Sequence, residues 1–281
     1  MSEGRKLAYL VLGGLLVMAG TGMAKFAPAG LLLSVVGIAL ILAGGFVPLT
    51  SAAPAVRGEG YPATLSARLD EPLSRWLWLV KWALAIPHAV ILVFLWVAFG
   101  VLTVAAFVAI LFTGRYPEPL FATNVGIMRW SWRVGFYAYS ALGTDRYPPF
   151  TLGEAAYPAQ LSVVYPGELS RGLALVKWWL LAIPHYLIIA IFSGTSPSAD
   201  SRGVQTRGGL LPLLVFFAGV ALLFTGRYPR GIFDLIIGLH RWIYRVVTYV
   251  ALMHDAYPPF RVDLGGEEPL SAPASIVRAT V

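Results

Sequence analysis

The chain carries one short polar motif twice, as FTGRYP within ILFTGRYPEP (Ile110–Pro119) and within LLFTGRYPRG (Leu222–Gly231). Each copy interrupts a long apolar stretch. Glycine often adopts the left-handed conformation that ends a helix, and proline cannot continue a helix. The motif therefore predicts that an apolar helix ends at each copy. The residues expected to form these helix ends are Gly114, Pro117, Gly226 and Pro229.

The motif is part of a long internal repeat. Three further pairs of segments recur in the same order in both copies, which indicates a duplication. They are Tyr61–His88 with Tyr157–His185, Arg129–Tyr137 with Arg241–Tyr249, and Asp145–Phe150 with Asp255–Phe260. The sequence thus predicts four regions. They are an N-terminal transmembrane hairpin at 1–50, repeat A at 61–150, repeat B at 157–260 and a flexible tail at 261–281.

The composition indicates an integral membrane protein. Of the 281 residues, 58% are hydrophobic and 12% are charged, and the mean hydropathy is +0.72. Two stretches, Leu7–Ala24 and Pro28–Val56, contain no charged residue, and crossing a bilayer takes about 20 apolar residues. Arg5 and Lys6 before the first stretch are typical of a signal peptide. The second stretch follows so closely that it favours a retained hairpin.

The absence of cysteine and the net charge exclude several kinds of site. Without cysteine there is no disulfide, thiolate nucleophile or cysteine-ligated metal. The net charge of +7 fits basic residues beside anionic lipid, whereas nucleic acid binding would require a basic stripe in a soluble domain. No Ser/His/Asp arrangement, phosphate-binding glycine loop or zinc-protease motif is present. We therefore expect no catalytic residue, no metal, no cofactor and no nucleic acid partner.

Two membrane topologies are compatible with repeat A. In the first, Ser74–Phe112 is a hairpin that crosses and returns, and Pro119–Leu142 lies along the surface. In the second, Ser74–Ile86 lies on the surface, His88–Phe112 crosses once, and Pro119–Leu142 crosses back. Repeat B contains the insertion SGTSPSADSRGVQTRGG, whose charges the second topology would bury in the bilayer. Each buried charge costs about 2.5–3.5 kcal/mol, so the insertion favours the hairpin.

The hairpin topology predicts a mainly α-helical membrane protein. It has about six transmembrane helices, two interfacial amphipathic helices and a small cytoplasmic β-sheet. Most basic residues then lie on one side, which the positive-inside rule makes cytoplasmic together with both termini. Since the extended segments also lie on that side, the repeats are expected to be parallel, with a pseudo-two-fold axis along the membrane normal. The segments expected to form the sheet are Pro62–Leu69, Pro149–Leu152, Ala159–Val164 and Pro259–Leu264.

Each predicted surface helix carries a polar stripe. Arg129, Arg133 and Tyr137 are four residues apart, and repeat B has the same pattern. Residues at this spacing share a helix face, and neighbouring aromatic residues are typical of an interfacial helix. The arginines either pair with nearby aspartates or hold an acidic phospholipid. Those aspartates are Asp145, Asp234 and Asp255. The candidate headgroup site comprises Arg115, Arg129, Arg133, Arg227, Arg241, Arg245, Trp130 and Trp242.

Two histidines, His88 and His185, follow prolines at equivalent positions of the repeats. Pro87 and Pro184 are expected to kink their helices, which leaves carbonyl groups for the imidazole or a water to satisfy. Metal binding is the less favoured interpretation, because no carboxylate or second histidine stands at ligand spacing. Two lysines in the same apolar stretches are expected to extend their charge to the surface. They are Lys81 and Lys177.

The repeated motifs FTGRYP, RWxxRVxxY and DxYPPF resemble those of a family of bacterial membrane domains that is common in actinobacteria. The family is catalogued as a domain of unknown function. The resemblance covers roughly 200 residues in two copies. It implies a membrane protein and brings no established activity, cofactor or catalytic residue.

Three functions remain open at this point. The leading hypothesis is a non-enzymatic protein of the bacterial plasma membrane that organises anionic lipid or accompanies a larger complex. Its glycine-rich N-terminal hairpin could dock to such a partner. The alternatives are a transporter with a path between the repeats, and an enzyme that modifies a lipid headgroup. The enzyme would use His88 and His185, or Asp145 and Asp255, as acid or base.

Overall fold

The structure is a computed structural model that describes residues 60–193, 195–196, 205–206 and 209–267. The predicted N-terminal hairpin and its glycines lie outside the described residues, as do the charged residues of the insertion. Most of the predicted tail also lies outside them.

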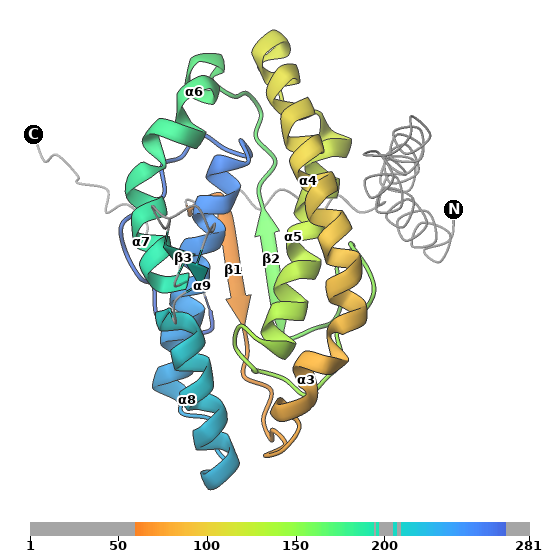
Figure 1. Ribbon diagram of the computed structural model, residues 1–281. Helices are drawn as coiled ribbons and strands as arrows, with labels where there is room; N and C mark the ends of the chain where they lie inside the picture. The colour runs from red at the N-terminus through yellow and green to blue at the C-terminus, as the bar shows by residue number, and fades with distance from the viewer. Residues whose placement is uncertain (1–59, 194, 197–204, 207–208, 268–281) are drawn as a thin grey trace, which may run out of the picture.

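Repeat A contains one strand and three helices (Figure 1). They are β1 (Ala63–Ala67), α3 (Trp78–Leu84), α4 (Ile86–Thr113) and α5 (Glu118–Ala138). Repeat B has the same order, with one helix interrupted. Its elements are β2 (Ala159–Val163), α6 (Arg171–Val176), the π-helical turn η1 (Lys177–Leu181), α7 (Ile183–Ser193), β3 (Thr195–Ser196), β4 (Gln205–Thr206), α8 (Leu210–Thr225) and α9 (Arg230–Val250).

The predicted hairpin within Ser74–Phe112 is wrong for repeat A. The chain turns at Ala85, and the 28 residues of α4 then form one continuous helix. After Pro87 in its first turn, α4 contains no proline and only one glycine, Gly100, so nothing in its sequence enforces a turn. The helical division follows the second topology. The number of membrane crossings stays a prediction.

In repeat B, two short paired strands of the insertion interrupt the helix that corresponds to α4. α7 starts and α8 ends at the motifs that bound α4, so the two helices together correspond to α4. Between them, β3 and β4 pair in antiparallel fashion. The described strands of the insertion therefore lie between the two parts of one helix.

The FTGRYP motif ends a helix in both repeats, as predicted. Gly114 has φ of 72° and Gly226 has φ of 70°, a region that favours glycine. Their N–H groups donate to the carbonyls of Ile110 and Leu222 at 2.8 Å. The next helices, α5 and α9, begin directly after Pro117 and Pro229. The histidine prolines also lie at helix starts, and repeat B bends by 42° between η1 and α7.

The two repeats exchange their strands. β1 and β2 form an antiparallel pair with Leu65 opposite Leu161 at its centre. β1 of repeat A packs against α9 of repeat B, and β2 packs against α5 of repeat A. The predicted sheet is confirmed for these two strands. The segments 149–152 and 259–264 are not strands and run as loops beside α5 and α9.

The long equivalent helices run in opposite directions. In Figure 1, α4 runs upwards while α7 and α8 run downwards, and α5 and α9 are opposed in the same way. The expectation that the equivalent helices of the two repeats are parallel is therefore wrong, because it rests on two similar hairpins that each return to the side where they begin. The direction of the axis relative to the membrane stays a prediction.

The described residues form three layers. α4, α7 and α8 make the layer nearest the viewer in Figure 1, and α5 and α9 lie behind them. α5 and α9 are buried along most of their length, because the sheet and loops cover their other side. The strands bury Leu65 and Leu161, and leave Thr64 and Ser162 exposed. One outer layer is therefore apolar and the opposite one polar.

Candidate functional site

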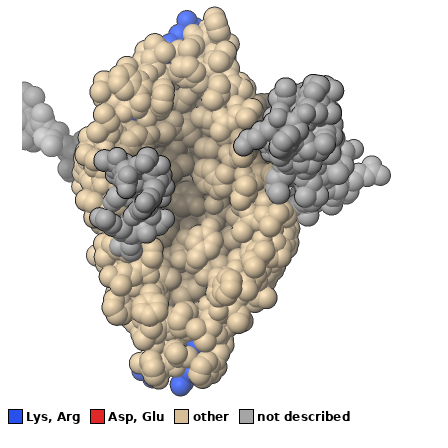
Figure 2. Space-filling model, viewed as in Figure 1, with Lys and Arg blue, Asp and Glu red and all other residues tan. Residues whose placement is uncertain are grey.

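The apolar layer presents a broad uncharged face, which we call the apolar face. Among the described residues visible in Figure 2, lysine and arginine show only at the two ends, and no acidic side chain shows. By length and composition, α4 could cross a membrane, and the bent α6–η1–α7 segment is a second candidate. The exposed apolar side chains include Val90, Val93, Val97, Val101, Val104, Val108, Phe112, Leu187, Leu213, Phe216, Phe217 and Phe224.

Several polar groups on the exposed helices bond to their own backbone. The indole N–H groups of Trp82 and Trp179 donate to helix carbonyls at 2.6 and 2.8 Å. The hydroxyls of Thr113 and Thr225 donate at 2.7 and 2.6 Å, and the Tyr186 hydroxyl donates at 2.6 Å. An unpaired polar group in hydrocarbon costs several kcal/mol. This pairing allows the apolar face to contact lipid without that penalty.

Each end of the apolar face carries charged residues from both repeats. Rim 1 comprises Arg115, Glu118, Glu168 and Arg171, and rim 2 comprises Glu71, Arg75, Arg227 and Arg230. An arginine of one repeat packs against the FTGRYP glycine of the other. A Cβ atom added to Gly114 would lie 3.6 Å from the Arg171 guanidinium, and one added to Gly226 would lie 2.6 Å from that of Arg75.

The two rims differ in charge. Rim 1 has two arginines and two glutamates, and Arg115 approaches Glu168 at 3.7 Å. Rim 2 has three arginines and one glutamate, and Arg230 approaches Glu71 at 3.3 Å. Ion pairs between such exposed side chains contribute at most about 1 kcal/mol, so they hold these arginines loosely. Rim 2 thus offers cations to an anionic ligand, and rim 1 is balanced.

The arginines of the predicted stripe do not face the apolar side. Arg129 donates through Nε to the carbonyl of Leu161 at 3.1 Å, and Arg241 donates to that of Leu65 at 3.0 Å. These two carbonyls belong to the central pair of the sheet, and each arginine reaches the strand of the other repeat. The arginines therefore fasten the exchanged strands to α5 and α9.

The remaining stripe arginines hold the loops that follow these helices. Buried Arg133 donates to the carbonyls of Thr151 and Gly153 at 2.6 and 3.1 Å. Its equivalent, Arg245, pairs with Asp263 at 2.7 Å. Burial lowers the pKa of Arg133 to about 10, which leaves it cationic at neutral pH.

The expected placement of these four arginines needs correction. Equal spacing correctly predicts that they share a helix face, but that face points to the sheet and loops. Trp130 and Trp242 are also buried inside the protein, so their side chains are not open to a lipid headgroup. The observed acidic partners also differ from the expected aspartates, since Arg129 approaches Glu154 at 3.6 Å and Arg245 pairs with Asp263. Of the candidate headgroup residues, Arg115 and Arg227 remain exposed.

Two buried lysines form equivalent ion pairs beneath the apolar face. Lys81 lies 2.7 Å from Asp145, and Lys177 lies 2.8 Å from Asp255. Lys81 also donates to the carbonyl of Thr144 at 2.8 Å and lies 5.3 Å from the Tyr137 ring. Burial lowers the pKa of Lys81, and Asp145 opposes this shift. The expectation that both lysines extend to the surface is wrong, because each lysine is buried and pairs with a partly exposed aspartate.

The two histidines sit in matching aromatic boxes. Nδ1 of His88 accepts a hydrogen bond from Trp130 at 3.0 Å, and Nδ1 of His185 accepts one from Trp242 at 3.1 Å. Each imidazole stacks on the phenylalanine of the YPPF motif, with centroids 3.8 and 4.4 Å apart. Each imidazole therefore accepts from an indole N–H, whereas the prediction was a contact with a carbonyl group freed by the proline. The stacked residues are Phe150 and Phe260.

Two candidates of the enzyme alternative, His88 and Asp145, have different partners. Trp130 donates to His88, and Lys81 pairs with Asp145. No group of three or more possible metal ligands occurs among the described residues.

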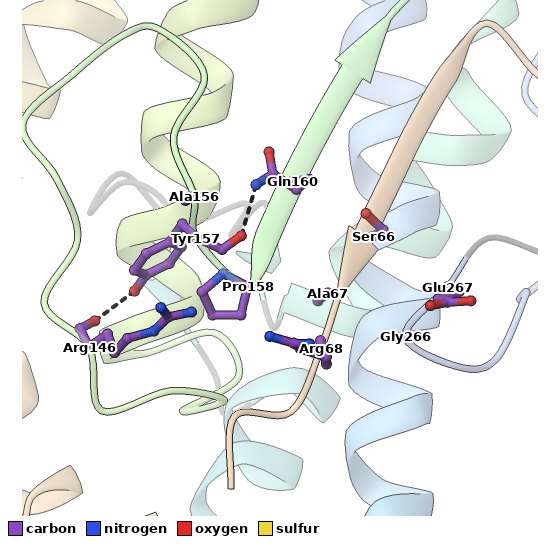
Figure 3. A pocket seen from close by; sticks show the side chains of 10 residues that line it. All are labelled: Ser66, Ala67, Arg68, Arg146, Ala156, Tyr157, Pro158, Gln160, Gly266 and Glu267. Atoms are coloured by element: carbon purple, nitrogen blue, oxygen red, sulfur yellow. Dashed lines mark hydrogen bonds between the residues drawn. The ribbon is translucent and has the colours of Figure 1, made fainter.

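A cavity of about 420 Å³ opens on the polar side (Figure 3). The Tyr157 hydroxyl donates to the carbonyl of Arg146 at 2.9 Å, and Gln160 donates to the carbonyl of Tyr157 at 2.8 Å. Ser66 and Gln160 come from the partly exposed side of the strands, so the cavity lies beside the sheet.

Sequence reasoning missed the strand exchange, the lysine–aspartate pairs and the histidine boxes. One signal for the pairs was available: a lysine before AIPH and an aspartate before the YPPF motif recur together in both repeats. Recurrence suggests a shared role, but it does not state that two distant segments touch.

The comparisons identify a repeated domain and no function. The family model of a domain of unknown function, DUF4389, matches residues 75–151 and 205–261. The first match covers α3 to α5, and the second begins within the insertion of repeat B and covers α8 and α9. No curated protein and no solved structure matches the chain. The chain thus contains two matches to one domain of unknown function.

Proposed function

We propose that this is a non-enzymatic protein of the bacterial plasma membrane that contacts lipid through its apolar face and organises acidic phospholipid at its charged rims. The observation that carries the proposal is an uncharged exposed face on which the polar groups described above bond to the protein itself. This pairing removes the cost of placing these groups in hydrocarbon. The apolar N-terminal stretches of the sequence are consistent with the same location.

Rim 2 is the better candidate for an acidic headgroup. Arg75 and Arg227 are exposed at the edge of the apolar face, beside the strongly exposed Phe224. A guanidinium can hold a phosphate through two hydrogen bonds, and each basic residue near an anionic surface contributes about 1 kcal/mol. The anionic leaflet is the cytoplasmic one, so the rims are proposed to lie on that side.

Native mass spectrometry of the full chain tests the headgroup site. Replacing Arg75 and Arg227 together by Gln should reduce retained acidic phospholipid by about tenfold or more, because two contacts of about 1 kcal/mol are lost. The equivalent change of Arg115 and Arg171 at rim 1 should have a smaller effect.

A matched control removes two exposed arginines from the polar side, Arg68 and Arg261. This variant should retain acidic phospholipid like the wild type. If the control loses as much lipid as the rim 2 variant, binding depends on net charge alone and the rim is not a site.

A further inference from the structure

We propose that the described residues of both repeats lie flat against one leaflet of the membrane, with the pseudo-two-fold axis of the repeats along the membrane normal. This inference rests on the proposed function, because it takes the apolar face as the surface that contacts lipid. It specifies the partner of that face as a single leaflet. The long helices then lie in the plane of the membrane and do not cross it.

The direction of the repeats leaves two orientations. α4 runs opposite to α7 and α8 (Figure 1), and the axis that relates the repeats passes through the pair Leu65 and Leu161. If α4 crosses the membrane, the repeats are inverted and their FTGRYP turns lie on opposite sides. If the axis is parallel to the normal, both turns lie at one depth on the same side.

Charges at mid-length oppose the crossing orientation. Glu154 approaches Arg129, which donates to the central strand residue Leu161. On the equivalent side of repeat B, Arg261 pairs with Asp263. The side chains of Glu154 and Arg261 are 61% and 57% exposed. With α4 upright, these charges would lie near the bilayer centre, where each costs about 2.5–3.5 kcal/mol.

The same charges are solvated in the flat orientation. The strands and loops that carry them form the layer opposite the apolar face, together with the exposed Thr64 and Ser162. The cavity beside the sheet also opens on this side (Figure 3). Apolar side chains on one face and polar ones on the other are typical of a protein that enters one leaflet by about 5–10 Å.

The length of the exposed stripe supports the same orientation. Valines at successive helix turns keep one side of α4 apolar from Val90 to Val108, and Ile86 and Phe112 extend it to both ends. The 28 residues of α4 span about 42 Å, which exceeds the hydrocarbon thickness of about 30 Å. A helix that lies in the membrane plane has no such mismatch.

Single-cysteine labelling of the full chain distinguishes the orientations, since the natural chain has no cysteine. Glu118→Cys and Arg230→Cys occupy equivalent exposed positions after the two FTGRYP turns. A membrane-impermeant maleimide is applied to intact cells and to inverted vesicles. It should label both positions from the same side, and it should label Glu154→Cys from that side as well. Labelling of the first two from opposite sides would overturn the flat orientation.

A depth profile along α4 provides the second readout. Spin labels at Val90, Val97 and Val108 should collide with oxygen more than with an aqueous nickel reagent, and at similar depths. A profile that is deepest at Val97 and shallow at both ends means crossing, and it overturns the flat orientation while leaving the proposed function intact. Labels that are freely accessible to the nickel reagent would contradict the proposed function itself.

Discussion

The two rims are built on the same FTGRYP turn, yet they carry different charges. In each, a glycine with positive φ ends the helix, and an arginine of the other repeat lies against it. Rim 1 balances its arginines with Glu118 and Glu168, whereas rim 2 has Arg230 at the position equivalent to Glu118. The turn is therefore a structural element common to the repeats, and the surrounding charges determine what each end can bind.

The buried pairs show the opposite behaviour, because they are the same in both repeats. Lys81 and Lys177 each reach an aspartate that also accepts a backbone N–H, from Ser74 at 2.5 Å and from Ser170 at 2.7 Å. Removing one partner of a buried pair leaves a desolvated charge, whereas removing both does not. These pairs therefore fix how the helix layers join in each repeat.

The largest effect is expected from breaking one of these pairs. Lys81→Met leaves Asp145, whose side chain is 27% exposed, without its cation, and it should lower the free energy of unfolding by up to about 3–5 kcal/mol. Lys177→Met should have a similar effect in repeat B. Denaturant or thermal unfolding in detergent measures both variants.

A double variant separates the unpaired charge from lost packing. Lys81→Met with Asp145→Asn should recover a large part of the loss, because no charge remains buried alone. If the loss in the double variant equals the sum of the losses in Lys81→Met and Asp145→Asn, the lysine and the aspartate do not act as a unit.

An intermediate effect is expected where the repeats differ beside the pair. His254 occupies the position of Thr144, and burial, followed by the charge of Lys177, lowers the pKa of His254 to about 4. The folded state therefore prefers the neutral imidazole. The contribution of His254 to the free energy of unfolding is complete above the unfolded-state pKa of about 6.5. It is lost as the pH falls towards 4, by up to about 3 kcal/mol.

Comparison with His254→Thr measures this contribution. The variant carries the residue of repeat A, so its free energy of unfolding should fall less than that of the wild type between pH 6.5 and pH 4. Parallel pH profiles would mean that His254 is not held neutral. The difference between the two proteins cancels the contributions of the other histidines.

A smaller effect is expected at the turns themselves. Gly114→Ala and Gly226→Ala each place a side chain at positive φ, which costs about 1 kcal/mol. A Cβ at Gly226 also displaces the Arg75 guanidinium, so this variant should retain less acidic phospholipid as well. Gly172→Ala is the control, since no other group lies within 4 Å of its Cβ position. Equal lipid retention in all three variants would separate Arg75 from lipid binding.

The sequence predicts local structure well and the packing of distant segments poorly. Glycine and proline specify the helix ends at Gly114 and Gly226, and alternation finds both strands of the sheet. The equal spacing of Arg129 and Arg133 shows that they share a face. It cannot show that a strand from the other repeat covers that face, because the exchange is a long-range contact.

The incorrect hairpin has a specific cause. The charges of the polar insertion of repeat B need water, and the sequence alone therefore places the end of a membrane crossing there. The β3–β4 hairpin instead interrupts one helix of the apolar layer. Periodicity and hydropathy show that this helix is apolar, but they do not distinguish a helix that crosses a membrane from one that lies along it.

Contact between the apolar face and lipid is the central claim, and collision accessibility of spin labels tests it most directly. Val104→Cys and Phe216→Cys occupy equivalent exposed positions on α4 and α8, and Thr64→Cys lies on the opposite, polar side. In the full chain reconstituted in lipid, we predict that the first two labels collide more with oxygen and the third more with an aqueous nickel reagent. Preference for the nickel reagent at all three positions would contradict the account.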